Sequence, residues 1–420
     1  MVILEKAKNL RLQPSAFSLE PLLQWFAKNA RDLPWRRTRD PYAIWISEIM
    51  LQQTQVKTVI PYWERWMREL PDVRALARAQ PQRVLKLWEG LGYYIRARNL
   101  HKAAQLLVAE SGGKFPDDFE AVLALPGIGR YTAGAICSIA FNQPVPALDG
   151  NVTRVLARVF GISGDVRKKS TDAQLWKLAG DLVSLAASIL VNDKLPITNY
   201  QLQMVAPLSG EPFVIGNSSL VIGHCHGTQT SGKSSALNQA LMELGATVCT
   251  ARQPQCSACP LRSQCVAYRT GQAGRLPRTG RRIPSTARRF AAFVVEHQGR
   301  FLVRQRPAGV INAHLWEFPN IELTVNDTTV KQAARSALNF SVAAVQPLGV
   351  IKHTITRYRI TLEVYETRLK RRPPATAKAK GSRLKAKGRW LAWERLHALP
   401  FTSAHRKILN ILEARKDLRS

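Results

Sequence analysis

The sequence predicts a multidomain protein in which a mainly α-helical region is followed by a smaller domain that contains β-strands. Between residues 17 and 187, apolar side chains recur mostly at the spacing of helices. Four cysteines lie close together between residues 249 and 265, and from Phe290 onward the apolar pattern changes to that of strands. A chain of 420 residues is long enough for about two or three domains with ordinary cores.

The net charge of the chain is strongly positive. Lysine and arginine number 61 against 29 aspartate and glutamate residues, which gives a formal charge of +32 and a pI of about 10.6. This excess predicts a polyanionic partner, with nucleic acid as the first candidate. Residues 1–30 contain no apolar run of signal-peptide type, and no apolar run reaches membrane-spanning length. We therefore expect a soluble intracellular protein without a membrane partner, cytoplasmic and nucleoid-associated if it is bacterial.

A glycine-rich turn and an acid stand out within Leu125–Arg154. Gly127 and Gly129 allow the chain to turn tightly, and a helix that begins near Arg130 would leave its first N–H groups free to bind a phosphate. About twenty residues later, Asp149 lies in a turn before the next predicted helix. A carboxylate near a phosphate-binding hairpin suggests chemistry on nucleic acid.

A predicted helix over Tyr42–Val59 carries Glu48 within an apolar run. The carboxylate either is solvated or lies in a pocket that raises its pKa, and a general acid at neutral pH needs the second state. Gln53 and Thr54 follow on the next turn, where they either reach base edges or form a polar helix end.

Two other stretches combine aromatic and basic side chains. Arg36 adjoins Trp35, either as a surface for phosphates and bases or as a solvated face over a core tryptophan. The turn Gly90–Gly92 contains Leu91 and precedes Tyr93, which is either a wedge near DNA or a ring packed between helices.

The cysteines have the spacing Cys249-x6-Cys256-x2-Cys259-x5-Cys265. In a reducing compartment, four thiols this close together indicate a metal site rather than disulfides. The spacing alone allows one tetrahedral zinc ion or one iron–sulfur cluster.

Residues 188–231 differ in composition from their surroundings, with few charges and many Pro, Gly, Ser and Asn residues. We interpret them as an insertion or an untrimmed segment. They run into 227–234, which formally matches the phosphate-binding pattern G-x-x-x-x-G-K-[ST] and raises the alternative of an ATPase. No parallel βαβ pattern surrounds this match, so nucleotide binding is disfavoured.

Several motifs together resemble the adenine DNA glycosylase (MutY) family of the helix-hairpin-helix superfamily, to which endonuclease III also belongs. They are WISEIMLQQTQV at 45–56, GLGYYIRARNL at 90–100, LPGIGRYTAGAI at 125–136, LDGNVTRVLAR at 148–158 and ALNQALMELGATVC at 236–249, together with the cysteine loop. The resemblance implies excision of adenine mispaired with 8-oxoguanine, and a [4Fe–4S] cluster on the four cysteines.

The resemblance also implies roles for individual residues. Glu48 would protonate adenine N7 and later handle the water, and Asp149 would stabilise the oxocarbenium ion or add to it, which is the two-carboxylate logic of glycoside hydrolysis. The remaining positions would orient the carboxylates (Asn151), line the pocket (Tyr131), fill or wedge the base stack (Gln53, Tyr93) and lie against the damaged base (Thr54, Leu91).

Two positions separate this chain from endonuclease III. Relatives of that enzyme carry Gln at the position of Glu48 and a Schiff-base lysine at the position of Tyr131, and this chain has neither. Many members of the adenine-specific family also have a lysine where Thr153 stands. The resemblance therefore implies a monofunctional glycosylase; the alternatives are a non-catalytic DNA lesion-binding protein and a bifunctional glycosylase/lyase like endonuclease III.

The last third of the chain predicts strands, the first two joined by a turn at Gln298-Gly299. It resembles the Nudix-like domain that reads 8-oxoguanine in this family. Lys331–Phe340 lacks the clustered acids that metal-dependent pyrophosphate hydrolysis needs. Thr356 occupies the family's loop toward the damaged base, and Arg368–Arg389 contains ten Lys/Arg and no acid, which predicts a disordered basic loop.

The resemblance thus implies a mainly α-helical helix-hairpin-helix glycosylase with an iron–sulfur cluster loop, followed by an α+β Nudix-like domain. We place the glycosylase region at 17–267, with its cluster loop at 249–265 and the insertion within it. A flexible basic linker follows at 268–289, and the Nudix-like domain occupies 290–415. We expect a monomer that acts on double-stranded DNA containing A:8-oxoguanine or A:G mispairs.

Overall fold

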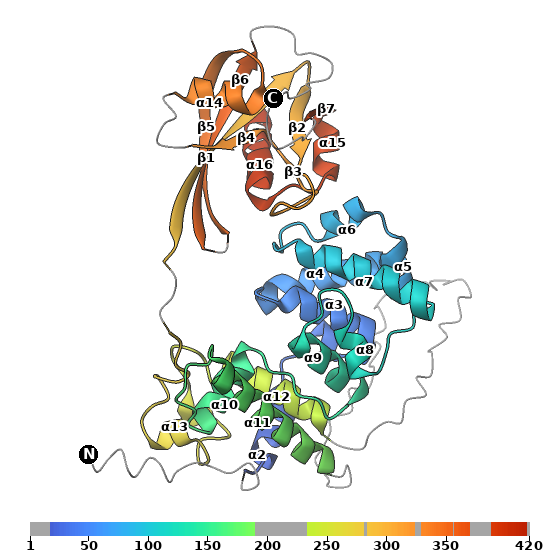
Figure 1. The fold of residues 1–420 in the computed structure, drawn as a ribbon, viewed down its shortest axis with the longest axis vertical. Coiled ribbons are helices and arrows are strands. Elements are labelled where there is room, and N and C mark those ends of the chain that lie inside the picture. The colour runs from blue at the N-terminus through green and yellow to red at the C-terminus, as the bar shows by residue number, and fades with distance from the viewer. Residues whose placement is uncertain are drawn as a thin grey trace, which may run out of the picture. The chain divides into compact units, whose positions relative to one another are not determined.

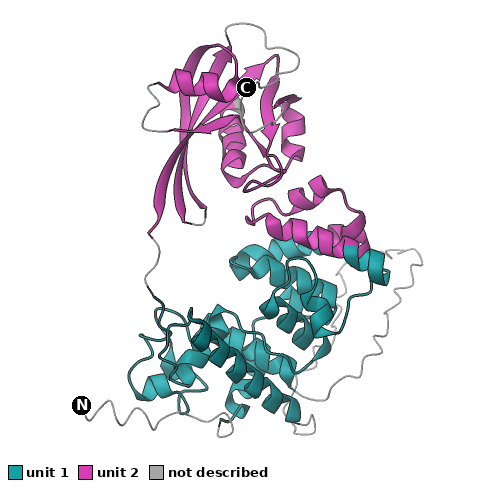
Figure 2. Cartoon of the chain, in the orientation of Figure 1, with its two compact units in different colours: residues 1–67, 106–280 teal, residues 68–105, 281–420 magenta. Residues whose placement is uncertain are grey.

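The computed structural model of the chain describes residues 17–189, 233–280, 284–323, 329–355, 357–369 and 388–417. The chain divides into two compact units, drawn in different colours in Figure 2. The first comprises residues 1–67 and 106–280, and the second comprises residues 68–105 and 281–420. Within the described ranges, no helix combines the length and apolarity required to cross a membrane.

The regular elements described in the first unit are all helices (Figure 1). Its elements are α2 (Glu20–Asn29), the 3-10 helix η2 (Pro34–Arg36), α3 (Pro41–Leu51), α4 (Val56–Glu69), α8 (Phe119–Leu123), α9 (Arg130–Phe141), α10 (Gly150–Val159), α11 (Lys169–Ser188), α12 (Ser234–Thr247), the 3-10 helix η3 (Cys256–Ala258) and α13 (Val266–Arg269).

The single helix predicted over Tyr42–Val59 is wrong, because α3 ends at Leu51 and α4 begins at Val56. Between them Gln53 has φ of +56°, in the left-handed region that commonly ends an α-helix. Apolar periodicity does not detect the break, since the apolar pattern resumes in α4. The break leaves Gln53 exposed at a turn between two helices.

Aspartate side chains fix the starts of two helices that bear on function. Asp40 accepts hydrogen bonds from the N–H groups of Tyr42 and Ala43 at the start of α3. Asp149 accepts one from the N–H of Val152 at the start of α10, at 2.7 Å. Each cap satisfies an N–H that the helix cannot pair, a contribution of about 1 kcal/mol. The position of the Asp149 carboxylate is therefore set by the helix it begins.

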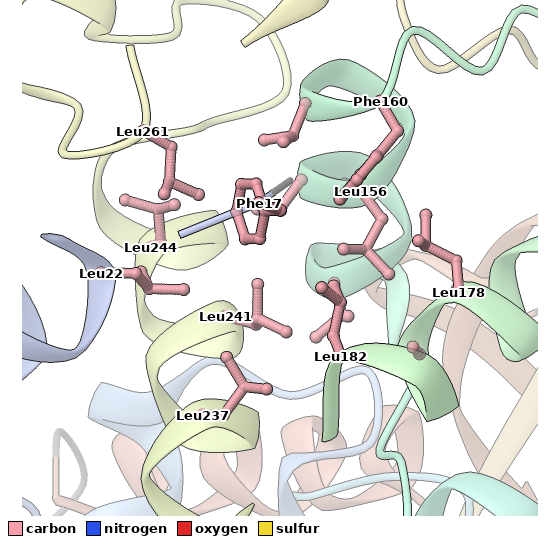
Figure 3. Close-up of a cluster of buried hydrophobic side chains, with 14 of the residues drawn as sticks. Phe17, Leu22, Leu156, Phe160, Leu178, Leu182, Leu237, Leu241, Leu244 and Leu261 are labelled. Atoms are coloured by element: carbon pink, nitrogen blue, oxygen red, sulfur yellow. The ribbon is translucent and has the colours of Figure 1, made fainter. Parts of the chain in front are cut away.

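One apolar core of the first unit lies between α2, α10, α11 and α12 (Figure 3). Leucines from these helices pack around Phe17 and Phe160, whose ring centroids are 5.2 Å apart. Leu261, from the cysteine loop, is fully buried in the same cluster. Burying a leucine side chain stabilises the fold by about 1.5–3 kcal/mol, so this core ties the cysteine loop to α10 and α12.

Helix α9 lies directly against the loop that leads to Asp149. A Cβ added at Gly134 would lie 2.1 Å from the carbonyl oxygen of Pro146, closer than real side chains come. Only glycine allows this approach. The contact fixes the distance between the helix that carries Tyr131 and the loop that delivers Asp149.

The second unit combines three helices from the middle of the chain with the C-terminal domain. The helices are α5 (Val73–Arg78), α6 (Pro81–Leu87) and α7 (Ile95–Ser111), of which residues 106–111 belong to the first unit. The C-terminal domain contains β1 (Thr286–His297), β2 (Arg300–Gln305), β3 (Trp316–Glu317), β4 (Asn320–Glu322), α14 (Val330–Leu338), β5 (Val342–Ile355), β6 (Tyr358–Leu369), β7 (Gly388–Ala392), α15 (Trp393–Ala398) and α16 (Ser403–Asp417).

The strands form one mixed sheet in the order β3-β2-β1-β6-β5, with β4 paired to β1 and β7 paired to β2. Strands β1 and β6 run parallel and the other pairs are antiparallel. The predicted turn between the first two strands is confirmed: Gln298 and Gly299 both have positive φ between β1 and β2. A mixed sheet with helices confirms the predicted α+β class.

Two apolar clusters cover the sheet of this domain. One includes Phe318, Phe401 and residues of α16, and the other includes Phe293 and residues of α14. Helix α14 forms over the stretch that lacks clustered acids.

Part of the region predicted as a flexible linker is bound to the first unit. Arg278 pairs with Asp165 in a parallel β-bridge, and the Gly280 N–H donates to the Asp165 carboxylate at 2.9 Å. Arg158 donates to the Leu276 carbonyl at 2.8 Å. Apolar periodicity did not reveal these contacts, because they are made by backbone groups and a buried arginine.

Candidate active site

Glu48 and Tyr131 form the centre of a buried polar site in the first unit. Glu48 is on α3 and only 5% exposed, and the Tyr131 hydroxyl, on α9, donates to its Oε2 at 2.6 Å. Burial raises the pKa of Glu48 to about 7, although the bond from Tyr131 acts in the opposite direction. At neutral pH such a carboxyl is partly protonated and suits a general acid. Of the two states considered for Glu48, a solvated carboxylate or one in a pocket with a raised pKa, the structure shows the second.

Asp149 lies close enough to this pair for its charge to raise the pKa of Glu48 further. Its own pKa is raised by burial, against the effect of hydrogen bonds from the Val152 N–H and the Asn151 side chain. The Asn151 amide donates to Asp149 Oδ2 at 2.8 Å. Burial thus favours the protonated form of Glu48, whereas the hydrogen bonds to Asp149 favour its ionised form.

Asn151 is supported by α12 and by an arginine. A Cβ added at Gly245 would lie 2.6 Å from the Asn151 Cβ, so α12 packs directly against this residue. Arg154 donates to Asn151 Oδ1 at 2.7 Å and to the carbonyl oxygens of Gly245 and Cys249. The amide that orients Asp149 is therefore connected to the start of the cysteine loop.

Glu243 is a functional candidate that the sequence analysis missed. It is 1% exposed and forms ion pairs with Arg31 and Arg36 at 2.6 and 2.8 Å. Burial raises the pKa of Glu243, but hydrogen bonds from the two arginines outweigh this effect and lower it to about 2. The preceding residue, Met242, has its sulfur 3.4 Å from the Tyr131 hydroxyl. The sequence signal that could have identified Glu243 is that it is a single acid within the apolar helix α12, as Glu48 is within α3.

Arg36, predicted as a DNA contact, is bound inside the protein. Its side chain is 16% exposed, donates to Glu243 and to the Arg31 carbonyl, and stacks over the Phe26 ring. Its positive charge lowers the pKa of Glu48. In this conformation the Arg36 charge acts on Glu48, and an ionic contact to a DNA phosphate would compete with Glu243.

The predicted phosphate-binding hairpin precedes α9. Gly127 has φ of +82°, which favours glycine, whereas Gly129 has φ of −103° and precedes the helix without a side-chain cap. A Cβ added at Gly129 would meet no atom within 4 Å, so the space before the helix is open. The Arg130 guanidinium lies over the Trp176 ring at 4.1 Å. An open helix N-terminus with an adjacent cation suits a phosphate.

The other predicted DNA contacts have varied surroundings. In the first unit, Gln53 is exposed, while Thr54 is partly buried and donates to the Gln52 carbonyl. In the second unit, Tyr93 is 45% exposed with φ of +47°, whereas Leu91 is only 6% exposed. Exposed Gln53 and Tyr93 are available to a ligand. Leu91 would require its turn to open before touching a base.

The four cysteines line one pocket of the first unit. Cys249, Cys256, Cys259 and Cys265 share it with apolar side chains and with Arg158. Burial, together with the charges of the other three cysteines, raises the pKa of Cys259 to about 11. Arg158 is 1% exposed and its guanidinium is 3.3 Å from the Cys249 sulfur. Arg262 also lines the pocket, and partly buried thiols beside arginine side chains suit a positively charged metal group that takes up thiolates.

Some predicted features lie outside the described residues. Thr356 does, as do most of the predicted insertion and all of the 227–234 match except Lys233 and Ser234. The basic stretch Arg368–Arg389 is described only at its two ends.

Two family models match the chain. The model described as "HhH-GPD superfamily base excision DNA repair protein" matches residues 46–180, and the model described as "NUDIX domain" matches residues 291–410. These matches confirm the predicted helix-hairpin-helix and Nudix-like assignments.

The chain is also similar to curated proteins named adenine DNA glycosylase. The protein of Mus musculus is 33% identical over 449 residues, covering 93% of this chain and 77% of the relative. The protein of Homo sapiens is 32% identical over 454 residues, covering 94% and 74%. That of Buchnera aphidicola subsp. Acyrthosiphon pisum (strain APS) is 34% identical over 304 residues, covering 72% and 73%.

Proposed function

The chain belongs to the adenine DNA glycosylase family, and we propose that it is a monofunctional glycosylase that removes adenine paired with 8-oxoguanine during base excision repair. The observation that carries this proposal is the buried carboxyl of Glu48, held by the Tyr131 hydroxyl near a second carboxyl, Asp149. An N-glycosidic bond to a purine breaks readily once the base is protonated, so the reaction needs an acid that is available at neutral pH.

Glu48 supplies this acid. With a pKa of about 7, its carboxyl carries a proton in roughly half of the molecules at neutral pH. The proton passes to N7 of an adenine that has left the base stack, and the C1′–N9 electron pair then leaves with the base. Glu48, now ionised, accepts a proton from the water that adds to C1′.

Asp149 stabilises the sugar cation that forms when the bond breaks. Its carboxylate receives hydrogen bonds from Asn151 and the Val152 N–H, which hold it in one orientation. A fixed negative charge next to a developing positive one lowers the barrier without reorganising. The carboxylate either stays as a counter-ion or adds to C1′ before water does.

Among the described residues, neither Tyr131 nor Thr153 offers an amine to the sugar. Tyr131 stands where a Schiff-base lysine would be needed, and its hydroxyl already binds Glu48. Thr153 lies on the first turn of α10. A lyase step begins with attack of an amine on C1′, so the reaction ends at the abasic sugar.

We also propose that the four cysteines hold a [4Fe–4S] cluster. The support is that four cysteines at short spacing line one pocket of the first unit. A cluster held there would bind the thiolates and keep the loop folded. Iron, labile sulfide and broad visible absorption in the purified protein are expected; stoichiometric zinc without colour would contradict this assignment.

The proposed partner is duplex DNA with adenine opposite 8-oxoguanine or guanine, bound by the protein as a monomer. A formal charge of +32 and the open N-terminus of α9 support binding to the phosphate backbone. The Nudix-like domain supports recognition of the base opposite adenine. For the location, we propose the cytoplasm, in association with the nucleoid, if the protein is bacterial.

Single-turnover incubation with an A:8-oxoguanine duplex tests the proposal. Adenine is released, and the strand breaks only after treatment with base. Borohydride present during the reaction traps no covalent protein–DNA product. Intact adenine after prolonged incubation would contradict the glycosylase, and strand breakage without base would contradict its monofunctional character.

A further inference from the structure

The turn that carries Tyr93 is held rigidly from within. Trp88 Nε1 donates to the Gly92 carbonyl at 3.0 Å. Arg96 donates to the carbonyl oxygens of Leu91 and Gly92 at 3.1 and 3.2 Å, and its guanidinium lies over the Trp88 ring. With its backbone fixed at φ of +47°, Tyr93 cannot change position unless the whole turn moves.

The residues on either side of this turn bind the C-terminal domain, which belongs to the same compact unit (Figure 2). The Phe401 N–H donates to Glu89 Oε1 at 2.8 Å, and the Tyr94 hydroxyl donates to the Phe401 carbonyl at 3.3 Å. Lys86 donates to the Leu399 carbonyl at 3.1 Å and to Glu89 Oε2 at 2.7 Å. Both the N–H and the carbonyl group of Phe401 are therefore bound by side chains of the helical segment 81–98.

The C-terminal side of this contact belongs to the body of its domain. Phe401 is fully buried, with its ring 5.8 Å from that of Phe318. The flanking backbone pairs with β3: the Trp316 N–H donates to the Pro400 carbonyl, and the Thr402 N–H donates to the Trp316 carbonyl. A displacement of Glu89 or Tyr94 would therefore be transmitted to the sheet.

A second contact prevents rotation about the first. Arg98, on the first turn of α7, donates to the Ala313 carbonyl at 3.0 Å, in the connection between β2 and β3. Two separated points of attachment fix an orientation, whereas a single one would act as a hinge. Tyr94 is 2% exposed and the Glu89 side chain 12%, so the hydrogen bonds of the first contact are shielded from water.

We propose that Lys86, Glu89 and Tyr94 are positioning residues that fasten the Tyr93 turn to the C-terminal domain. This inference rests on the proposed function, in which the C-terminal domain reads the base opposite adenine, and on the wedge role in the base stack that the family resemblance implies for Tyr93. Because the two are fastened, recognition of the opposite base also places the wedge. The selectivity for the base opposite adenine then depends on Lys86, Glu89 and Tyr94, which touch neither that base nor the adenine.

The fastening itself is tested by hydrogen exchange of the full-length protein without DNA. In Glu89→Ala, amide exchange across residues 399–402 becomes about tenfold faster, because a hydrogen bond to a charged acceptor is lost. In Tyr94→Phe, which keeps the ring, exchange there rises less. Arg83→Ala is the matched control: it breaks a surface pair with Glu69 on the same helical segment and leaves exchange at 399–402 unchanged.

The coupling is tested by single-turnover adenine release from A:8-oxoguanine and A:G duplexes. In Glu89→Ala and Tyr94→Phe, the preference for A:8-oxoguanine falls about tenfold while release from A:G stays within about twofold. General destabilisation would instead lower both rates together, and thermal unfolding of each variant detects it. An unchanged preference in both variants would overturn the proposal, as would unchanged exchange at 399–402.

The outcomes distinguish a failure of this inference from a failure of the proposed function. If the wild-type protein released no adenine or showed no preference for 8-oxoguanine, the proposed substrate and the coupling to it would both be wrong. The exchange measurement would still decide whether the turn and the domain are fastened.

Discussion

Tyr131 and Glu48, from two helices 83 residues apart in sequence, form a hydrogen bond of 2.6 Å inside the protein. The bond lowers the pKa of Glu48 and burial raises it, and burial has the larger effect. Their balance leaves the carboxyl near pKa 7, where it both donates and accepts a proton at neutral pH. The predictions below follow from this balance and from the groups that maintain it.

Tyr131→Phe removes the hydroxyl while keeping the ring. Loss of a bond that favours the ionised carboxylate raises the pKa of Glu48 above its value of about 7. Single-turnover excision is therefore retained to higher pH, with its alkaline limb displaced by about one unit. The pH profile of adenine release measures the shift, and a limb at the wild-type position would contradict the assignment of Glu48 as the acid.

Asp149→Asn removes a charge but keeps a helix cap. Asparagine caps helices about as well as aspartate, so thermal stability stays close to that of the wild type. Excision falls by about a hundredfold or more, because the sugar cation loses its counter-ion. The same change lowers the pKa of Glu48, whose raised value includes a contribution from the Asp149 charge. Excision at wild-type rate in a folded variant would remove Asp149 from the mechanism.

Glu48 makes the stability of the fold depend on pH between about 4.5 and 7. Its pKa is raised from 4.5 to about 7 in the folded state, so its contribution to stability is fully present below about pH 4.5 and is lost as pH rises through 7. Glu48→Gln removes this dependence. The variant is therefore stabilised relative to wild type at pH 8 by up to about 3 kcal/mol more than at pH 5. Thermal unfolding of both proteins at pH 5 and pH 8 tests this. An equal stability difference between the variant and the wild type at the two pH values would contradict the raised pKa of Glu48.

Gly245→Ala places a methyl group 2.6 Å from Asn151 Cβ and 2.9 Å from its carbonyl oxygen. Asn151 must shift, and the amide that orients Asp149 moves with it, so excision falls by about tenfold or more. Gly180→Ala in α11 is the control, since its methyl group meets no atom within 4 Å. We expect it to retain excision and to gain up to about 1 kcal/mol of stability. Equal effects of the two changes would argue against close packing at Gly245.

The sequence was sufficient to predict features that depend on short-range patterns. Glu48 and Asp149 were found because each is a lone acid in an apolar or turn context, and the Gln298-Gly299 turn because Gly299 tolerates the positive φ of a tight hairpin turn. Glu243 and Arg36 were not recognised as a pair, because they are 207 residues apart and meet only after folding. The helix break at Gln53 was missed because the apolar period continues across it.

Release of adenine by Glu48→Gln, under single turnover on an A:8-oxoguanine duplex, tests the central claim most directly. Glutamine keeps the size of the side chain but cannot transfer its proton, so we expect binding of the duplex within about threefold of wild type and excision reduced by about a thousandfold or more. Excision at a rate close to that of the wild type would show that the acid lies elsewhere and would contradict this account.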